Sequence, residues 1–432
     1  MHSRVYSFLS IVLLLAACAQ PGGIRRARPA SVGMSAAHLA LIDSAVNASI
    51  GQGDIPGAVV GVVRYGSLVY EKAFGYKSVY PEKDTMTVQT MFDLASVSKC
   101  VGTTLSFMQL VEQGKVRLID KVSCYIPEFQ PWEDPETGEK VDITVQNLLT
   151  HSSGIDAYLA DVPAYVERYG AGSPDSLMHY IAVEAGRHFR PGSDRLYSCL
   201  NFITLQHILE RVSGERLCDY AQKHVFDVLG LKHTTYMPLA LEGDAFFGAN
   251  LKADAPEFSA AFPATSETDA LVSDVAPSEV MQDGSVLRGQ VHDPIARIIN
   301  LGNSGNAGVF SNVEDLAVIC AALLNGGAFN GHRILGPQTV RKMFEEPSTD
   351  DPKVARALGW DTYYTGPYTS GDIFALQNLR GHTGYTGTSI LLDPDTQTAV
   401  ILLAHRVHPT DDGSVARLRS VVATIVAASI GR

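Results

Sequence analysis

The chain has 432 residues, of which 46% are hydrophobic and 19% charged, a composition typical of a folded globular protein. Its formal net charge of −12, with no basic run beyond Arg25, Arg26 and Arg28, argues against a nucleic-acid partner. The chain is longer than one typical core requires, so we expect two subdomains.

The N-terminus carries the features of an export signal. Arg4 precedes an apolar run over residues 8–17 that is too short to span a bilayer. The run ends in Leu15-Ala16-Ala17-Cys18, which resembles the bacterial lipobox, where the Cys is acylated and becomes the first mature residue. We therefore expect a signal peptide over residues 1–17, lipidation of Cys18 and a tether over residues 18–33.

These features predict an exported bacterial lipoprotein whose membrane contact is its lipid anchor. Ala19 after the anchor favours the periplasmic face of the outer membrane, if the host has one. The alternative is an ordinary signal peptide with an incidental Cys18. No later segment approaches about eighteen consecutive apolar residues, so the remaining chain is expected to be soluble.

Apolar periodicity predicts the elements of a hydrolase domain over residues 34–432. A helical pattern covers residues 36–50, and residues 57–74 predict a β-hairpin that turns at Tyr65-Gly66-Ser67. Strand signals return at residues 391–403 and are followed by a helix over residues 414–430. Between these ends lie helical patterns at residues 105–113, 145–149, 200–212 and 313–324. We expect an α/β (α+β) fold: an antiparallel sheet formed by both chain ends, flanked by helices, with an inserted helical subdomain at approximately residues 100–330.

The cysteines give no metal pattern. Besides Cys18 there are five, an odd number, so at least one thiol is expected to be free in an oxidising compartment. A Cys100–Cys199 disulfide and two free thiols both remain open. Neither a Cys/His zinc pattern nor His-Glu-x-x-His occurs, and we expect no metal and no cofactor.

The first motif with chemical meaning is Ser96-Val97-Ser98-Lys99, which leads into an apolar helical stripe ending at Gly114. Residues three apart on a helix are neighbours, so Lys99 should lie beside the Ser96 hydroxyl, where the helix N-terminus favours negative charge. An amine accepts a proton only when neutral, so desolvation or a neighbouring cation should lower the pKa of Lys99. The structural alternative is a capping serine followed by a surface lysine.

Two further motifs follow this one along the chain. Residues 197–199 read Tyr-Ser-Cys ahead of a helical pattern, and residues 381–384 read Gly-His-Thr-Gly ahead of a glycine-rich turn. The three motifs, in this order, resemble the serine β-lactamase and penicillin-binding-protein superfamily, with its Ser-x-x-Lys, Tyr-x-Asn or Ser-x-Asn, and Lys/His-Thr-Gly elements. Segments at residues 148–154, 289–293 and 305–311 extend the resemblance over nearly the whole mature chain. Within the superfamily, residues 289–293, the long segment before them and residues 381–388 are most similar to penicillin-binding protein 4B-like DD-carboxypeptidases.

The resemblance implies roles for individual residues in a cleft between sheet and helical region. Ser96 would be the acylated nucleophile, Lys99 the proton acceptor or the group that tunes it, and Tyr197 the partner in proton transfer. The backbone N–H groups of Ser96 and Tyr385 would form the oxyanion hole. The residues implied to contact the substrate are Cys199, His382, Thr383 and Gly384. A protonated His382 would meet a substrate carboxylate and, with Lys99, stabilise a Tyr197 phenolate.

Two residues depart from the family pattern. Cys199 stands where the second motif usually has Asn, and a thiol cannot offer the donor and acceptor pair of an amide. Asn201 is two residues further on and would point to another side of a helix. Asn306 stands where relatives commonly have His, and it cannot carry a proton near neutral pH.

Three functions from different classes follow from this pattern. The leading one is a serine hydrolase acting through an acyl-enzyme, as a penicillin-binding DD-carboxypeptidase or related peptidase on peptidoglycan peptides. The first alternative is a serine esterase or β-lactamase, and the second is a non-catalytic envelope binding protein. The expected partner is an acyl or peptide small-molecule substrate derived from the cell wall. No Gly-x-Ser-x-Gly occurs, which excludes a typical α/β-hydrolase.

Overall fold

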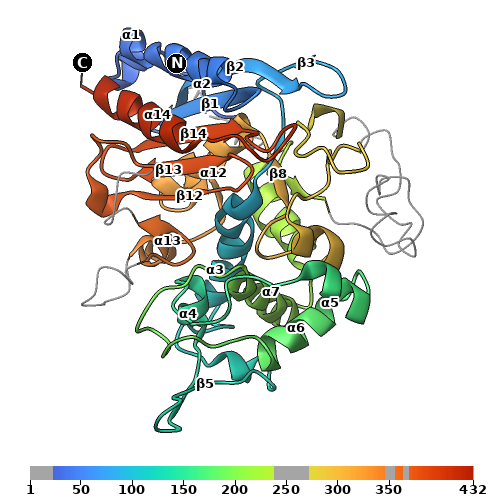
Figure 1. The fold of residues 1–432 in the computed structure, drawn as a ribbon. Coiled ribbons are helices and arrows are strands. Elements are labelled where there is room, and N and C mark those ends of the chain that lie inside the picture. The colour runs from blue at the N-terminus through green and yellow to red at the C-terminus, as the bar shows by residue number, and fades with distance from the viewer. Residues whose placement is uncertain (1–22, 238–271, 346–355, 363–368, 432) are drawn as a thin grey trace, which may run out of the picture.

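The computed structural model describes residues 23–237, 272–345, 356–362 and 369–431 (Figure 1). The expected signal peptide, Cys18 and the first part of the tether lie outside these residues. Among the residues that are described, none of the helices is both long and apolar enough to cross a bilayer.

The folded body includes the second part of the expected tether. Ile24 is buried in the main core, and Arg26 forms an ion pair with Glu71 at 2.7 Å. The backbone of Arg25 and Ala27 hydrogen-bonds to Leu68 on the first hairpin. Packing on the domain therefore begins upstream of residue 34, because Ile24 supplies an apolar anchor and Arg26 a charge partner.

The main sheet joins both ends of the chain, as the sequence predicted. It has seven strands in the order β11-β12-β13-β14-β1-β2-β3, and all neighbours are antiparallel. The strands are β1 (Gly57–Arg64), β2 (Ser67–Ser78), β3 (Asp84–Thr85), β11 (Asp361–Thr362), β12 (Arg380–Thr383), β13 (Ser389–Asp393) and β14 (Thr398–Ala404). The central pairing of β1 with β14 aligns Ala58 with Ala404 and closes the sheet between the two ends.

The hairpin of β1 and β2 turns where the sequence predicted. Tyr65 and Gly66 both have positive φ, 46° and 69°, which is the requirement of a type I′ turn. Arg64 pairs with Ser67 across that turn. The twist of such a turn matches the twist of the strands, so this short loop fixes the register of the sheet centre.

Helices cover both faces of the sheet (Figure 1). One face packs against α1 (Ala36–Leu39), α2 (Leu41–Gln52) and α14 (Ala416–Ser429), and the other against α12 (Val313–Leu324). All eight residues of β1 are buried for this reason, which explains its continuous apolar sequence. At Gly61 a Cβ would lie 2.4 Å from Val313, so α12 approaches the strand backbone closely.

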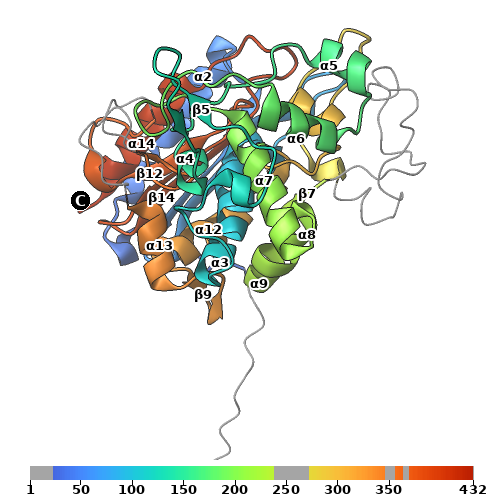
Figure 2. The same ribbon diagram turned by 90° about the horizontal axis from the view of Figure 1, so that it is seen from below.

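The inserted region is mainly helical, and α3 (Leu105–Glu112) lies between it and the sheet, in contact with α7, α8 and α13 (Figure 2). Its helices are α4 (Val145–Leu149), α5 (Val162–Tyr169), α6 (Pro174–Val183), α7 (Cys199–Ser213), α8 (Leu217–Ala221) and α9 (Asp227–Leu229). Short strands pair as β4-β8-β7, β5-β6 and β9-β10: β4 (Phe92–Asp93), β5 (Trp132–Glu133), β6 (Lys140–Val141), β7 (Thr235–Tyr236), β8 (Val309–Ser311), β9 (Ala328–Phe329) and β10 (His332–Arg333). A further helix is α13 (Pro337–Phe344). Although α12 falls within the expected insert, it packs on the sheet instead.

Candidate active site

Ser96 lies in a strained turn between β4 and the helical run that leads to α3. The residue before it, Ala95, has a φ of 45°, a left-handed conformation that non-glycine residues rarely adopt. The buried Asp93 carboxylate accepts a hydrogen bond from the Ala95 N–H at 2.8 Å and holds this turn. Ser96 therefore opens the helical run as the sequence predicted. The run begins with a 3₁₀ turn, η2 (Ala95–Val97), and a π-helical segment, η3 (Lys99–Thr104).

Lys99 and Ser96 meet directly. The Lys99 Nζ donates to Ser96 Oγ at 2.9 Å and to the backbone oxygen of Asn306 at 2.8 Å, and it lies 3.5 Å from Cys199 Sγ. Lys99 is completely buried. The alternative of a surface lysine after a capping serine is therefore wrong.

The protonation of Lys99 differs from the expectation of a lowered pKa. Burial does disfavour the ammonium, but Cys199 and Tyr197, which become anionic when they lose a proton, outweigh it and raise the pKa of Lys99 above its ordinary value. Lys99 is consequently a cation in the resting protein.

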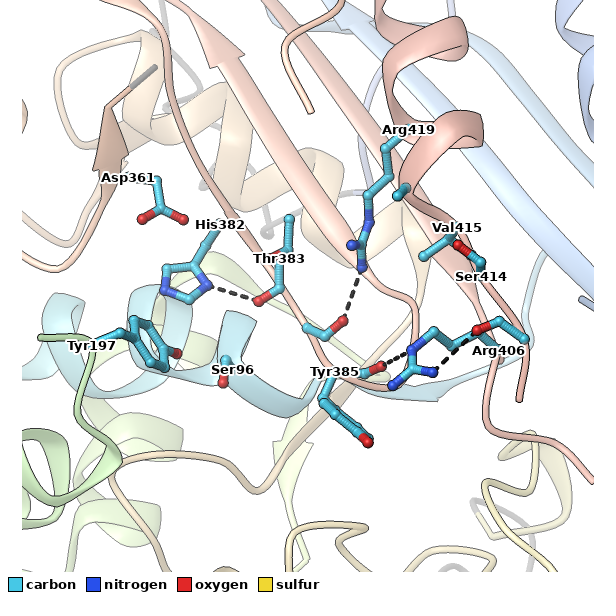
Figure 3. A pocket seen from close by; sticks show the side chains of 13 residues that line it. Ser96, Tyr197, Asp361, His382, Thr383, Tyr385, Arg406, Ser414, Val415 and Arg419 are labelled. Carbon is cyan, nitrogen blue, oxygen red and sulfur yellow. Dashed lines mark hydrogen bonds between the residues drawn. The ribbon is translucent and has the colours of Figure 1, made fainter. Parts of the chain in front are cut away.

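Tyr197 approaches the same two groups from the start of α7. Its side chain points toward Ser96 (Figure 3), and its ring centroid lies 5.1 Å from Lys99 Nζ. Removal from water raises the pKa of Tyr197, and the Lys99 charge opposes that rise. The buried, neutral His151 packs 4.4 Å from the Tyr197 ring, because its Nδ1 accepts a hydrogen bond from the Ser198 N–H at 3.0 Å.

The residues that follow Tyr197 have two roles: some stabilise the start of α7, and one contacts Lys99 in the site. Ser198 caps α7 by accepting from the Asn201 N–H, while Cys199 turns toward Lys99. The side chain of Asn201 accepts a hydrogen bond from Ser153 Oγ at 2.7 Å in a buried network. Asn201 therefore does not replace the amide that the family usually has at position 199.

The strand β12 forms the opposite wall. His382 is buried, and its Nδ1 donates to the Thr383 carbonyl at 2.9 Å. Burial, together with the charges of Arg356 and Lys99, lowers the pKa of His382 to about 4, against the opposing effect of Asp361. Without a substrate, His382 is therefore neutral near neutral pH, and the contact of a protonated His382 with a substrate carboxylate or a phenolate stays a prediction.

The turn after β12 is tied to the nucleophile segment by two hydroxyl groups. Thr386 Oγ1 donates to the Asp93 carbonyl at 2.8 Å, and Thr388 Oγ1 donates to the Leu94 carbonyl at 2.9 Å. These two bonds fix the turn, which contains Tyr385, relative to the backbone that leads to Ser96. Segments nearly 300 positions apart in the sequence thus form one rigid junction.

A cavity of about 550 Å³ opens between the two walls (Figure 3). Its lining includes Ser96 and Tyr197 on one side and His382, Thr383, Gly384 and Tyr385 on the other; it is completed by Asp361, Arg406, Gly413, Ser414, Val415, Ala416 and Arg419. The predicted site residues therefore gather around one cavity, except that Lys99 and Cys199 lie behind its surface.

Sequence reasoning did not find every group that shapes this cavity. Arg356 is only 3% exposed and forms an ion pair with Asp361, whose pKa it lowers in spite of burial. The Arg356 guanidinium also lies 5.7 Å from the Tyr197 ring. Asn306 contributes its backbone oxygen rather than its side chain, which accepts from Ser304 Oγ at 2.6 Å. No motif marks any of these contacts, because each depends on tertiary packing.

The cysteines that the structure describes do not form disulfide bonds with one another. Within the described part of the chain all five cysteines are free, and Cys100 Sγ donates to the Gly359 carbonyl at 3.1 Å while Cys199 faces Lys99. A Cys100–Cys199 disulfide is therefore absent, since the two side chains leave their backbones toward different neighbours.

Comparison with known proteins agrees with this geometry. The family model described as Beta-lactamase matches residues 42–424. An N-acetylmuramyl-L-alanine amidase of Bacillus subtilis is 30% identical over 87% of this chain and 82% of its own length. A putative D-alanyl-D-alanine carboxypeptidase of Escherichia coli is 29% identical over 94% of this chain and 91% of its own length.

Solved structures share the fold. EstCE1, a hydrolase with promiscuous acyltransferase activity, aligns with a TM-score of 0.66 and 23% identity over 90% of this chain and 99% of its own. A penicillin-binding protein homologue from Caulobacter crescentus aligns with a TM-score of 0.64 and 17% identity over 92% of this chain and 99% of its own.

Proposed function

The chain belongs to the β-lactamase family, and from that premise we propose that it is a serine hydrolase that forms an acyl-enzyme on Ser96. The observation that carries this proposal is the 2.9 Å contact of Lys99 Nζ with Ser96 Oγ at the edge of a cavity that Tyr197 also lines. A serine hydroxyl is a weak nucleophile and needs such an adjacent proton-transfer group.

Lys99 and Tyr197 act as a pair in the acylation step. At rest Lys99 is cationic and Tyr197 neutral, so the pair must first lose one proton to become a base. The Ser96 proton then passes to the pair as Oγ bonds to the acyl carbon, and the pair returns it to the leaving group. Water later attacks the ester, and the same groups transfer the proton in reverse order.

The oxygen of the tetrahedral intermediate is bound by backbone groups. We assign the oxyanion hole to the backbone N–H groups of Ser96 and Tyr385, two residues that line the cavity from its opposite walls. Because the hydroxyl groups of Thr386 and Thr388 tie these walls together, both donors are pre-oriented before the charge develops. Thr383 and Gly384 line the strand against which the substrate lies, with a neutral His382 as a hydrogen-bonding neighbour.

The substrate that the relatives suggest is a cell-wall peptide. A DD-carboxypeptidase-type reaction on D-alanyl-D-alanine ends is our leading assignment, because relatives that cover nearly the whole chain carry that name. The B. subtilis amidase points to the same material, although to a different bond.

Ester cleavage is a second candidate because of one residue. Cys199 occupies the position where an Asn would bind a substrate amide, and a thiol offers no such donor and acceptor pair. An ester substrate does not require an amide contact on that side.

The test of this function is the covalent adduct. Purified protein is incubated with a β-lactam, a D-alanyl-D-alanine peptide and a p-nitrophenyl ester, and the mass of the intact protein is followed over time. We expect an adduct on Ser96 that Ser96→Ala abolishes, and the fastest substrate identifies the class. A wild-type protein that binds these compounds without any adduct would be a non-catalytic binding protein and would sink the proposal.

We also propose that the protein is exported and held on a membrane by acyl chains on Cys18, at the periplasmic face of the outer membrane in a diderm host. The lipobox-like sequence supports this, because it places Cys18 where the bacterial modification adds several acyl chains. Several chains hold a protein on a membrane far more firmly than one chain does. Globomycin should cause the precursor to accumulate, and Cys18→Ala should release the protein into the detergent-poor phase. A water-soluble mature product that begins at another residue would contradict the anchor.

A further inference from the structure

The peptide unit between Gly384 and Tyr385 has two ends with different neighbours. A trans peptide is planar, so its C=O and N–H point in opposite directions in one rigid plane. The Tyr385 N–H is the proposed oxyanion donor on the strand wall. Whatever holds the Gly384 carbonyl therefore also sets the direction of the Tyr385 N–H.

Arg419 holds that carbonyl. It extends from α14 and is only 7% exposed, and its Nη2 donates to the Gly384 carbonyl at 2.9 Å (Figure 3). The same Nη2 also donates to the Thr388 carbonyl at 2.8 Å. The Gly384 N–H donates to the same Thr388 carbonyl at 2.7 Å, so the guanidinium closes the base of the turn.

The turn itself also supports this carbonyl, because the Gly387 N–H donates to it at 3.1 Å, but a backbone N–H carries no charge. A Cβ on Gly384 would lie 2.1 Å from Thr388 Oγ1 and 2.4 Å from the Leu94 carbonyl. Thr386 and Thr388 anchor the far part of the turn to the nucleophile segment. Among the contacts described above, Arg419 is the cationic one on the Gly384 carbonyl itself.

We propose that Arg419 is a positioning residue that orients and polarises the Gly384–Tyr385 peptide, so that its N–H becomes a stronger oxyanion donor. A charged donor on a carbonyl draws electron density through the peptide and makes the N–H at its other end more acidic. The effect is worth most when negative charge develops on the substrate oxygen. This inference rests on the proposed acyl-enzyme function.

Arg406 provides a matched control on the same wall. Its Nε donates to the Tyr385 carbonyl at 2.7 Å and its Nη1 to the Gly413 carbonyl at 3.2 Å. The Tyr385 carbonyl belongs to the next peptide, whose N–H is that of Thr386. Removing Arg406 thus takes away a cation and a backbone contact from the same turn without releasing the carbonyl partner of the oxyanion donor.

The experiment compares a p-nitrophenyl ester with its thionoester, in which sulfur replaces the carbonyl oxygen. Sulfur is a poor acceptor, so the ratio of the two acylation rates reports the hydrogen bonds to the oxyanion. We expect Arg419→Met to lower this ratio by roughly tenfold or more, since losing a whole oxyanion donor costs ~10²–10³ in rate. Arg406→Met should change both rates by the same factor. Arg419→Lys, with a single ammonium donor, should recover part of the ratio.

The ratio is measured within one sample, so a smaller folded fraction does not alter it. If Arg419→Met does not fold, Arg419→Lys still tests the inference, because its ratio should fall below that of wild type by a smaller factor. An unchanged ratio in the Arg419 variants, with wild type acylated on Ser96, overturns the inference and leaves the proposed function intact. An equal fall of the ratio in Arg406→Met also overturns it. The loss of either arginine would then weaken the oxyanion hydrogen bonds equally, and Arg419 would have no special role. Wild type without a Ser96 adduct overturns the proposed function itself.

Discussion

The two walls of the cleft hold their reacting atoms by different means. On the helical wall, Ser96 and Lys99 are neighbours in sequence, and their side chains meet directly at 2.9 Å. On the strand wall, the turn after β12 presents backbone atoms, and Arg406 and Arg419 from later in the chain fix its carbonyl groups. A substitution on the helical wall removes a reacting side chain. A substitution on the strand wall changes the orientation of backbone groups that remain in place.

The contrast predicts that substitutions on the helical wall have the larger effects. Lys99→Met should reduce the rate of acylation by at least ~10³-fold, since the variant keeps the volume but loses the proton-transfer group and the charge. Stopped-flow acylation with a p-nitrophenyl ester measures this. The exposed Lys115, changed to Met, is the matched control and should acylate at the wild-type rate. A Lys99→Met variant within tenfold of wild type would show that the two walls do not differ in this way.

Tyr197→Phe tests the next contribution on the same wall. The phenyl ring preserves the contact with His151, so folding should be unaffected while acylation slows by about 10²-fold, the usual scale for a positioned proton-transfer group. Tyr76 has the same exposed fraction, 38%, and lies on β2, which makes Tyr76→Phe a suitable control. If both variants acylate equally fast, Tyr197 lines the cavity but takes no part in proton transfer.

The same contrast explains how much could be predicted from the sequence. The hairpin at Tyr65-Gly66 and the sheet built from both ends follow from local turn chemistry and apolar runs, and they are confirmed. The Ser96–Lys99 contact depends on one helical turn and is equally local. Arg356 and Arg419 carry no motif, because their meaning comes from the carboxylate or carbonyl that packing brings to them. The upward shift of the Lys99 pKa also depends on neighbours about 100 and more positions away.

The pH dependence should come from the helical wall alone. The pKa values of Lys99 and Tyr197 are raised, so their base form is scarce near neutrality and acylation should rise about tenfold per pH unit from about pH 6 to about pH 8. His382, with its pKa lowered to about 4, stays neutral over this range and should add no inflection. Stopped-flow rates across this range check both points. An inflection near pH 6.5 that disappears in His382→Gln would contradict the assignment.

Cys199→Asn tests the smallest effect, at a position that lies beside Lys99 and outside the lining of the cavity. Asn at this position accepts from Lys99 through Oδ1 and offers Nδ2 to a substrate carbonyl, which the thiol cannot do. One added hydrogen bond is worth ~1 kcal/mol, so acylation by D-alanyl-D-alanine peptides and β-lactams should rise roughly fivefold, while an ester should change little. Cys199→Ala removes the thiol without adding an amide and should show no gain on any of the three. A gain on the ester alone, or a similar fall on every substrate, would mean that Cys199 has a role of its own beside Lys99. The protein would then be specialised away from peptide amides, as its replacement of the family's Asn allows.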